Sequence, residues 1–267
     1  MTTRRLISRR LAIKEMGKAG LAVMVLGTAA CANDAGEGTT STTARPATTT
    51  STAPPTTVAD TTSSTTTIAP PAGASFQRVD LSFVSAYILY RAGEAALVDT
   101  GVDGSADAIE ASLAEVGLGW EAVGHVILTH KHPDHVGSID DVLERAPGAM
   151  VYAGAADIPA ISSSLAPVAI GDGGTVFGLE IIGTPGHTAG HISVLDSVAG
   201  ILVAGDALNG TGGGVAGPDP GFSEDMAIAI DSVGKLAGLD YEVALFGHGD
   251  PVLEGASTAV ADLAAGL

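Results

Sequence analysis

Cysteine is almost absent from this chain, and aromatic and basic residues are scarce. Only Cys31 among the 267 residues is a cysteine, so no disulfide can form within the chain. Aromatic residues make up 4% of the chain, and 12 Lys and Arg stand against 30 Asp and Glu, a formal net charge of −18. An acidic chain without a basic patch repels phosphate backbones and anionic lipids, so we expect no nucleic-acid partner.

The N-terminal segment has the order of an export signal. Residues 1–18 carry six Lys and Arg against Glu15 alone, and residues 19–30 are apolar and end in small side chains. This apolar run is too short for a membrane-spanning helix, which needs about 20 residues. Removal of residues 1–31 would leave six Lys and Arg against 29 Asp and Glu, a formal net charge of −23.

Two details refine the predicted export signal over residues 1–31. Residues 8–14 resemble a twin-arginine signal, with Ala12 where Phe is usual, so Sec export fits as well. Thr28-Ala29-Ala30-Cys31 resembles a bacterial lipoprotein box, which implies cleavage before Cys31 and lipidation of its sulfur. Because two or more acyl chains hold a protein stably on a membrane, we expect a lipoprotein on the outer face of the plasma membrane that meets the membrane only through this anchor. Secretion with an unmodified cysteine is the alternative.

The segment 32–74 consists mainly of Thr, Ser, Ala and Pro and has almost no large apolar side chain. Such a segment cannot bury enough surface to offset its chain entropy, so we predict a disordered tether that is open to O-glycosylation. Residues 75–267 have the length of one ordinary domain. The sequence leaves the oligomeric state open.

Apolar periodicity and turn residues predict a mixed α+β domain. Strand runs lie at both ends of the domain, with helices between and after them, which predicts two packed sheets with helices outside. The Gly-rich segment 209–221 is expected to be a loop that shapes a substrate entrance or simply connects its neighbours. The predicted strands are 84–91, 95–99, 125–129, 149–153, 175–177, 179–182, 191–195, 201–204 and 242–246, and the predicted helices are 103–116, 136–145, 155–165, 222–236 and 254–267.

Three of the seven histidines lie within six positions, directly after the apolar run 126–128. In a nearly extended backbone, side chains at i and i+2 point the same way, so His130 and His132 can bind one ion. Asp134 and His135 follow where the chain turns, and they can face a second ion. Neutral imidazole suits zinc and iron, and a carboxylate completes such a site. A chance run of polar surface residues is the alternative.

Three further residues follow apolar strands: His187, Asp206 and His248. Each has a glycine directly before it, which lets the backbone approach closely. Rigid strand ends hold ligands well. We therefore expect these side chains to join the histidine cluster.

Together with Asp99 in Leu97-Val98-Asp99-Thr100-Gly101, these residues resemble the motif set of the metallo-β-lactamase fold superfamily, over nearly all of residues 76–267. The resemblance implies a four-layer αβ/βα sandwich with the metal site at one edge. Asp206 stands where class B1 and B2 β-lactamases have Cys, and it resembles the glyoxalase II and lactonase branches.

The resemblance also implies a dinuclear metal centre. Three histidines would hold the first ion, two histidines and an aspartate the second, and another aspartate would bridge them. In that order, the implied ligands are His130, His132 and His187, then Asp134, His135 and His248, then Asp206.

Other residues near the cluster are not expected to bind the ions directly. Asp99 is expected to orient the histidine cluster, or else to be a simple turn aspartate. His191 is expected either to make an outer hydrogen bond to the site or to bond backbone. Lys131 either meets an anionic substrate or, as a residue between two ligands, points away. His125 is expected to be structural.

The implied cofactors are two Zn²⁺ ions, and a hydroxide between them would attack the carbonyl of an ester, lactone or thioester. Asp134 would steer this hydroxide and move its proton, and no Ser or Cys nucleophile is needed. Because no basic helical domain follows His248, glutathione thioesters fit poorly, and we expect a neutral or weakly charged small molecule. The alternatives are an Fe²⁺-dependent sulfur dioxygenase that uses His130, His187 and Asp206, and a non-enzymatic surface binding protein.

Overall fold

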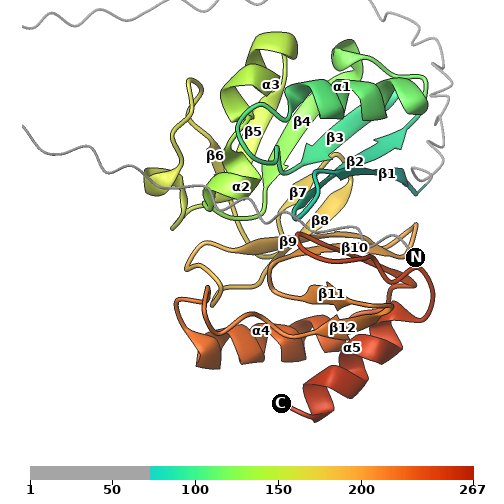
Figure 1. Cartoon of the computed structure of the whole chain (residues 1–267), viewed down its shortest axis with the longest axis vertical. Helices are drawn as coiled ribbons and strands as arrows, with labels where there is room; N and C mark the ends of the chain where they lie inside the picture. Colours follow the sequence, from blue (N-terminus) through green and yellow to red (C-terminus); the bar gives the residue numbers. More distant parts are fainter. Residues whose placement is uncertain (1–72) are drawn as a thin grey trace, which may run out of the picture. The chain divides into compact units, whose positions relative to one another are not determined.

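Two β-sheets pack face to face in the computed structural model, with helices on their outer sides (Figure 1). The structure describes residues 73–267. The predicted export signal, Cys31 and the tether up to residue 72 lie outside these residues and stay predictions. Ala74 is buried and donates its backbone N–H to Asp196 Oδ2 at 2.7 Å, which ties the start of the described chain to the second sheet.

The first sheet has six strands in sequential order. The pairs β1–β2 and β2–β3 are antiparallel, and the following pairs up to β6 are parallel. The strands are β1 Ser75–Asp80, β2 Ser85–Arg91, β3 Glu94–Val98, β4 Val123–Leu128, β5 Met150–Gly154 and β6 Val168–Ile170.

The second sheet has five strands in the order β13-β10-β9-β8-β7, and only the pair β10–β13 is parallel. A separate hairpin pairs β11 with β12. The strands are β7 Thr175–Val176, β8 Leu179–Gly183, β9 Ile192–Asp196, β10 Ile201–Gly205, β11 Asn209–Thr211, β12 Gly214–Ala216 and β13 Val243–Phe246.

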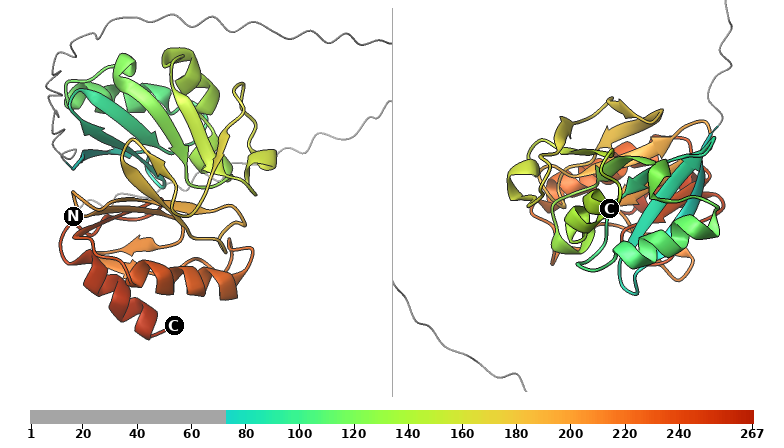
Figure 2. Two further views of the ribbon diagram at one scale, coloured as in Figure 1. Left: turned by 180° about the vertical axis from the view of Figure 1, so that it is seen from behind. Right: turned by 90° about the horizontal axis from the view of Figure 1, so that it is seen from above.

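The helices lie on the two outer sides, as the views of Figure 1 and Figure 2 show. The first sheet is covered by α1 and α3, and the second by α4 and α5, so the chain forms four layers. The helices are α1 Ala106–Glu115, α2 Pro133–Val136, α3 Ile139–Arg145, α4 Met226–Ala237 and α5 Ala256–Ala265. This arrangement confirms the predicted mixed fold of two packed sheets.

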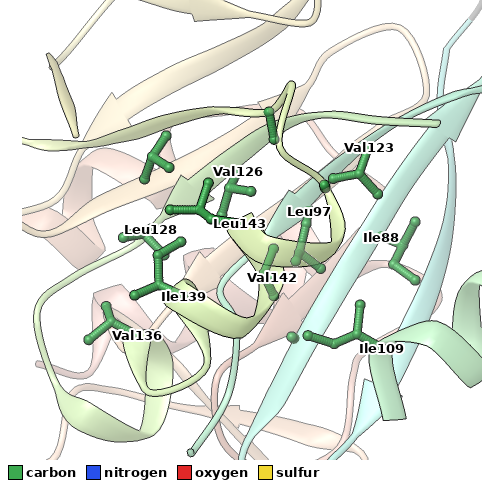
Figure 3. Close-up of a cluster of buried hydrophobic side chains, with 14 of the residues drawn as sticks. Ile88, Leu97, Ile109, Val123, Val126, Leu128, Val136, Ile139, Val142 and Leu143 are labelled. Carbon is green, nitrogen blue, oxygen red and sulfur yellow. The ribbon is translucent and has the colours of Figure 1, made fainter. Parts of the chain in front are cut away.

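Alternating side chains of each strand fill different layers of the core. In β2, Ile88 points toward α1 and α3 (Figure 3), whereas Tyr87 and Leu89 pack between the sheets. In β4, Leu128 takes the outer layer and Ile127 the inner one. This two-residue alternation explains why both strands read as continuous apolar runs: they are buried on both faces.

Several expectations about the secondary structure are wrong. The segment 155–165 is not a helix but contains only the single 3-10 turn Ile158–Ala160. Pro159 lacks a backbone N–H, and Asp157 turns inward to bond other loops, so neither supports a longer helix. The segment 209–221 is not all loop, because β11 and β12 form a hairpin within it. The predicted helix 136–145 is also divided between α2 and α3, and β1 lies in a stretch for which no strand was predicted.

Within residues 73–267, no helix is long and apolar enough to cross a membrane.

The layered core predicts that replacement of isoleucine by alanine lowers the free energy of unfolding by different amounts at two positions. Ile109 of α1 is 0% exposed in the outer core layer, whereas Ile228 of α4 is 44% exposed. We expect Ile109→Ala to lower the free energy of unfolding by about 2–5 kcal/mol, because it removes buried methyl groups and leaves a cavity. Ile228→Ala should cost less than about 1 kcal/mol. Urea unfolding of both variants measures the difference, and equal costs would contradict the described core.

Candidate metal centre

The seven predicted ligands come from the ends of four strands and meet in one cluster. The loop after β4 and the short helix α2 carry His130, His132, Asp134 and His135, and His187 follows β8. Asp206 and His248 follow the parallel neighbours β10 and β13, whose ends lie side by side. The structure therefore brings together every residue that the sequence nominated as a ligand.

One group contains three imidazoles. His132 Nδ1 lies 3.1 Å from His130 Nε2 and 2.9 Å from His187 Nε2. The three ring nitrogens converge on one point, and His130 and His187 are buried. Burial lowers the pKa of both buried rings, which keeps them neutral with a free lone pair, the form that binds a metal ion.

A second group combines one carboxylate with two imidazoles. Asp134 Oδ2 lies 3.8 Å from His135 Nε2 and 3.4 Å from His248 Nε2. All ligand atoms of this group, like those of the first, lie within 4.8 Å of one another. His135 is buried, whereas Asp134 and His248 are partly open.

Asp206 lies between the two groups. Its Oδ2 atom is 3.4 Å from His187 Nε2 and 3.9 Å from His130 Nε2 in the first group. It is 3.3 Å from His248 Nε2, and Oδ1 is 3.4 Å from His135 Nε2, in the second. One buried carboxylate therefore faces histidines of both groups.

Asp99 fixes the cluster from behind. Its carboxylate accepts bonds from Thr129 N at 2.7 Å and Thr129 Oγ1 at 2.8 Å, and it contacts His135 Nδ1 at 2.8 Å. This contact leaves His135 Nε2 to face the site. Asp99 is buried in the left-handed region with φ of 63°, a conformation that costs energy and is held here by these contacts.

Backbone and hydroxyl groups orient the rings of two further histidines. His248 Nδ1 contacts the carbonyl oxygen of Phe83 at 2.6 Å, which turns Nε2 toward Asp134 and Asp206. His191 accepts the backbone N–H of Asp206 at Nε2, 3.0 Å away, and its Nδ1 lies 2.8 Å from Thr184 Oγ1. Burial lowers the pKa of His191 to about 3, so the ring stays neutral. His191 thus touches the site through the Asp206 backbone.

Glycine is required directly before Asp206 and directly before His248, because a larger side chain would not fit there. A Cβ atom on Gly247 would lie 2.1 Å from Asp206 Oδ1 and 2.6 Å from His135 Cε1. A Cβ atom on Gly205, which has φ of 57°, would lie 2.7 Å from His191 Nε2. The backbone therefore approaches the cluster directly.

The cluster favours positive charge at its second group. Burial opposes a charge on His135, but Asp99 and Asp206 outweigh it and raise the pKa of the ring to about 10. Hydrogen bonding to Asp134 and then to Asp206 raises the pKa of His248 to about 10. Burial would raise the pKa of Asp206, but the charge of His135 outweighs it and holds this pKa well below its ordinary value. A bound cation would supply the charge that these surroundings favour.

Atoms that lack a hydrogen-bond partner also indicate that the cluster fits metal ions. Among the described residues, His135 Nε2 and Asp206 Oδ1 are buried side-chain atoms without a hydrogen-bond partner. Such orphaned atoms are rare unless an ion or water binds them. Imidazole nitrogens with a few carboxylate oxygens are the ligands that zinc and iron prefer.

Asp157 is a residue of the site that the sequence did not point to. It is fully buried, and it accepts bonds from Lys131 N at 3.0 Å, Thr188 Oγ1 at 2.6 Å and Gly190 N at 2.8 Å. It therefore joins the loop of His130 and His132 to the loop of His187. No local pattern marks it, because all three of these partners are more than 25 residues away.

Lys131 and His125 have structural surroundings. The ammonium of Lys131 pairs with Glu224 at 2.6 Å and lies 3.9 Å from Asp157. Glu224 also accepts the N–H of Ala189, so this pair adds a second connection between the same two loops. His125 packs beside Tyr152 and Phe177, outside the cluster.

A cavity of about 590 Å³ opens beside the cluster. Five of its lining residues are predicted ligands, namely His132, Asp134, His187, Asp206 and His248. The others are Phe83, Pro133, Asn209, Asp219 and Phe222. Three of these lie in or just after the Gly-rich segment 209–221, which therefore does border the cavity.

Comparison with known proteins agrees with this geometry. The metallo-beta-lactamase superfamily matches residues 79–160 and 165–248. A Bacillus subtilis protein named a probable metallo-hydrolase, YflN, is 30% identical over 201 residues, 58% of this chain and 75% of that protein. The hydroxyacylglutathione hydrolase of Alkalilimnicola ehrlichii is 35% identical over 146 residues, 54% of this chain, and the match spans about half (52%) of that enzyme.

Solved structures show the same fold. A metallo-beta-lactamase family protein from Thermus thermophilus superposes with a TM-score of 0.58 at 26% identity, over 73% of this chain and 79% of that one. Sequence and structure agree, and the chain belongs to the metallo-beta-lactamase superfamily of metallo-hydrolases.

Proposed function

We propose that this protein is an exported hydrolase that binds two zinc ions and cleaves an ester, a lactone or a thioester. The observation that carries the proposal is the position of Asp206. Its carboxylate lies 3.3–3.9 Å from four histidines that belong to two separate ligand groups. This is the arrangement that a carboxylate shared by two neighbouring ions requires.

In this proposal, His130, His132 and His187 would hold one ion, Asp134, His135 and His248 would hold the other, and Asp206 would be available to both. Bound divalent ions lower the pKa of water and polarise a carbonyl oxygen. One relative is named a hydroxyacylglutathione hydrolase, a name that describes action on an acylated glutathione. This relative supports acyl-transfer chemistry on this fold.

The chain's own residues supply the proton path. Asp134 borders the cavity, and its hydrogen bond with His248, with burial opposing, lowers the pKa of the carboxyl group. It is therefore a carboxylate at neutral pH and can accept a proton at Oδ2 from an attacking water. The described residues that line the cavity include no Ser, Thr or Cys, which favours water as the nucleophile.

Metal analysis and hydrolysis test the proposal together. The full chain, purified without chelator, should contain about two zinc per chain and should hydrolyse aryl esters or thioesters. His187→Ala should lower kcat/KM by roughly a hundred-fold or more, because it removes a ligand. His125→Ala, a histidine outside the cluster, should leave both measurements unchanged.

Other outcomes separate the alternatives. About one iron per chain, together with oxygen uptake and sulfite formation, would replace the hydrolase by the dioxygenase. A chain that binds no metal even when zinc is offered would contradict any metal-dependent activity and leave a surface binding protein.

The contacts of Asp157 predict a role in metal retention. Asp157→Asn keeps the size of the side chain but turns one acceptor into a donor that faces the donors of Lys131, Thr188 or Gly190. We expect zinc affinity, measured by competition with a chelator, to fall roughly ten- to a hundred-fold. Stability should fall by about 1–3 kcal/mol as well.

Asp141 of α3 is exposed and gives the control, because Asp141→Asn makes the same chemical change away from the cluster. A loss of stability in Asp157→Asn with zinc affinity unchanged would show that this carboxylate supports the fold alone.

Export and anchoring enter the proposal on sequence grounds. We expect Cys31→Ser to abolish labelling of the protein by a radioactive fatty acid and to move it from the membrane fraction to the medium. Replacement of Ser41 by Thr in the predicted tether serves as the control, since it leaves the export signal and the cysteine in place. Membrane recovery and labelling that persist in Cys31→Ser would rule out the lipid anchor.

A further inference from the structure

The mouth of the cavity carries two of the most exposed aromatic side chains in the described chain. Phe83 is 61% exposed and Phe222 is 70% exposed, and both line the cavity. By contrast, Tyr87 and Phe246 are completely buried in the core. Single exposed apolar residues are common, but two that flank one cavity beside a reaction centre are typical of a ligand site.

Both phenylalanines are held in place by the site's own contacts. The backbone oxygen of Phe83 bonds His248, and the two rings lie nearly parallel with centroids 6.3 Å apart. Phe222 follows a turn in which Asp219 accepts the N–H of Gly221 at its side chain and that of Phe222 at its backbone oxygen. These contacts therefore place both residues at the cavity mouth, through the backbone at Phe222 and through the backbone and a ring contact at Phe83.

No Lys or Arg side chain borders the cavity among the described residues. Residues 73–267 contain five Lys and Arg against 26 Asp and Glu, a formal net charge of −21. Each of the five is in an ion pair elsewhere, and Lys131, next to the cluster, is neutralised by Glu224 and Asp157. The other pairs are Arg78–Asp250, Arg91–Asp196, Arg145 with Asp107 and Glu110, and Lys235–Asp172.

The outer wall of the cavity therefore offers apolar surface and negative charge. Beyond the ligand groups, the described lining residues include one charged side chain, Asp219, among Phe83, Pro133, Asn209 and Phe222. A carboxylate or sulfonate on the substrate would meet no positive partner on this wall and would face the charge of Asp219. An alkyl or aryl group would instead bury apolar area against the two rings.

We infer that the site selects an uncharged substrate whose acyl or aryl group packs between Phe83 and Phe222, and that Asp219 helps to reject anionic analogues. This inference rests on the proposed hydrolase function and names its substrate class. Acylated glutathione and other substrates with free carboxylates fall outside it.

Two probes with the same ring system test binding without catalysis. N-phenyl-1-naphthylamine is neutral, and 1-anilinonaphthalene-8-sulfonate adds one negative charge. By fluorescence titration of the full chain, with and without zinc, we expect the neutral probe to bind at least about ten-fold more tightly. Phe222→Ala should weaken the neutral probe by about ten-fold, because it removes a ring from the wall. Equal binding of the two probes would overturn the inference.

The charge of Asp219 can be removed without removing its turn contact. Asp219→Asn keeps an oxygen for the N–H of Gly221, so the turn should persist. We expect this variant to bind the sulfonate about three-fold more tightly and the neutral probe equally. Asp262→Asn makes the same change on the exposed face of α5 and should alter neither value. An unchanged sulfonate affinity in Asp219→Asn would remove this residue from the proposal.

Catalysis is tested with two esters of equal chain length. The p-nitrophenyl ester of pentanoic acid ends in a methyl group, and the p-nitrophenyl monoester of glutaric acid ends in a carboxylate. After subtraction of each ester's rate without protein, which for the glutarate monoester includes attack by its own carboxylate, we expect kcat/KM for the pentanoate to be about ten-fold higher or more, with the difference smaller in Phe222→Ala.

The ester assays distinguish a failure of the proposed function from a failure of the proposed substrate class. A zinc-loaded protein that hydrolyses neither ester, and no lactone or thioester with an alkyl or aryl group, contradicts the proposed function and the substrate class with it. A protein that hydrolyses the glutarate monoester as fast as the pentanoate keeps the proposed function and overturns the substrate class alone.

Discussion

The contact of one buried carboxylate with four histidine rings is the interaction on which the candidate site depends. Asp206 is 5% exposed, and a carboxylate in such surroundings is strongly destabilised unless positive charge or hydrogen bonds compensate it. Its backbone N–H bonds His191, and its oxygens face rings of both ligand groups. The glycines at 205 and 247 are needed because any side chain there would collide with this arrangement. Charge, packing and backbone conformation therefore meet at the same residue.

Two other buried carboxylates hold the ligands around it, and they act on different sides. Asp99 lies at the end of β3 and fixes Thr129 and His135, within the sheet that carries the first histidines. Asp157 joins the loop after β4 to the loop after β8, which belong to different sheets. The first carboxylate sets the orientation of a ring, whereas the second sets the distance between loops. Because both are outside the cavity, substitutions there separate metal retention from the chemistry of the reacting groups.

The sequence was sufficient to bring the predicted ligands together because local spacing and strand ends determine where they lie. His130 and His132 are two positions apart after a buried strand, and His187, Asp206 and His248 each follow an apolar run, so topology alone brings them to one edge. The residues that were missed depend on long-range contacts. Asp157 belongs to a segment predicted as helix, and its function comes from partners on two distant loops. Phe83 and Phe222 carry no motif, and only folding places them at the same cavity.

The division between ligands and cavity wall separates two questions about this protein. The histidine and aspartate cluster lies within the residues that match the superfamily, and under the proposed function it would determine which bond is cleaved. The outer wall would determine which molecule reaches that chemistry, and its two phenylalanines and its aspartate come from the turn before β2 and the segment after β12. These connections can change without disturbing the sheets, because their side chains are exposed. We therefore expect a wall with two phenylalanines and one aspartate to narrow the range of substrates by excluding anionic ones, independently of the predicted metal ligands beneath it.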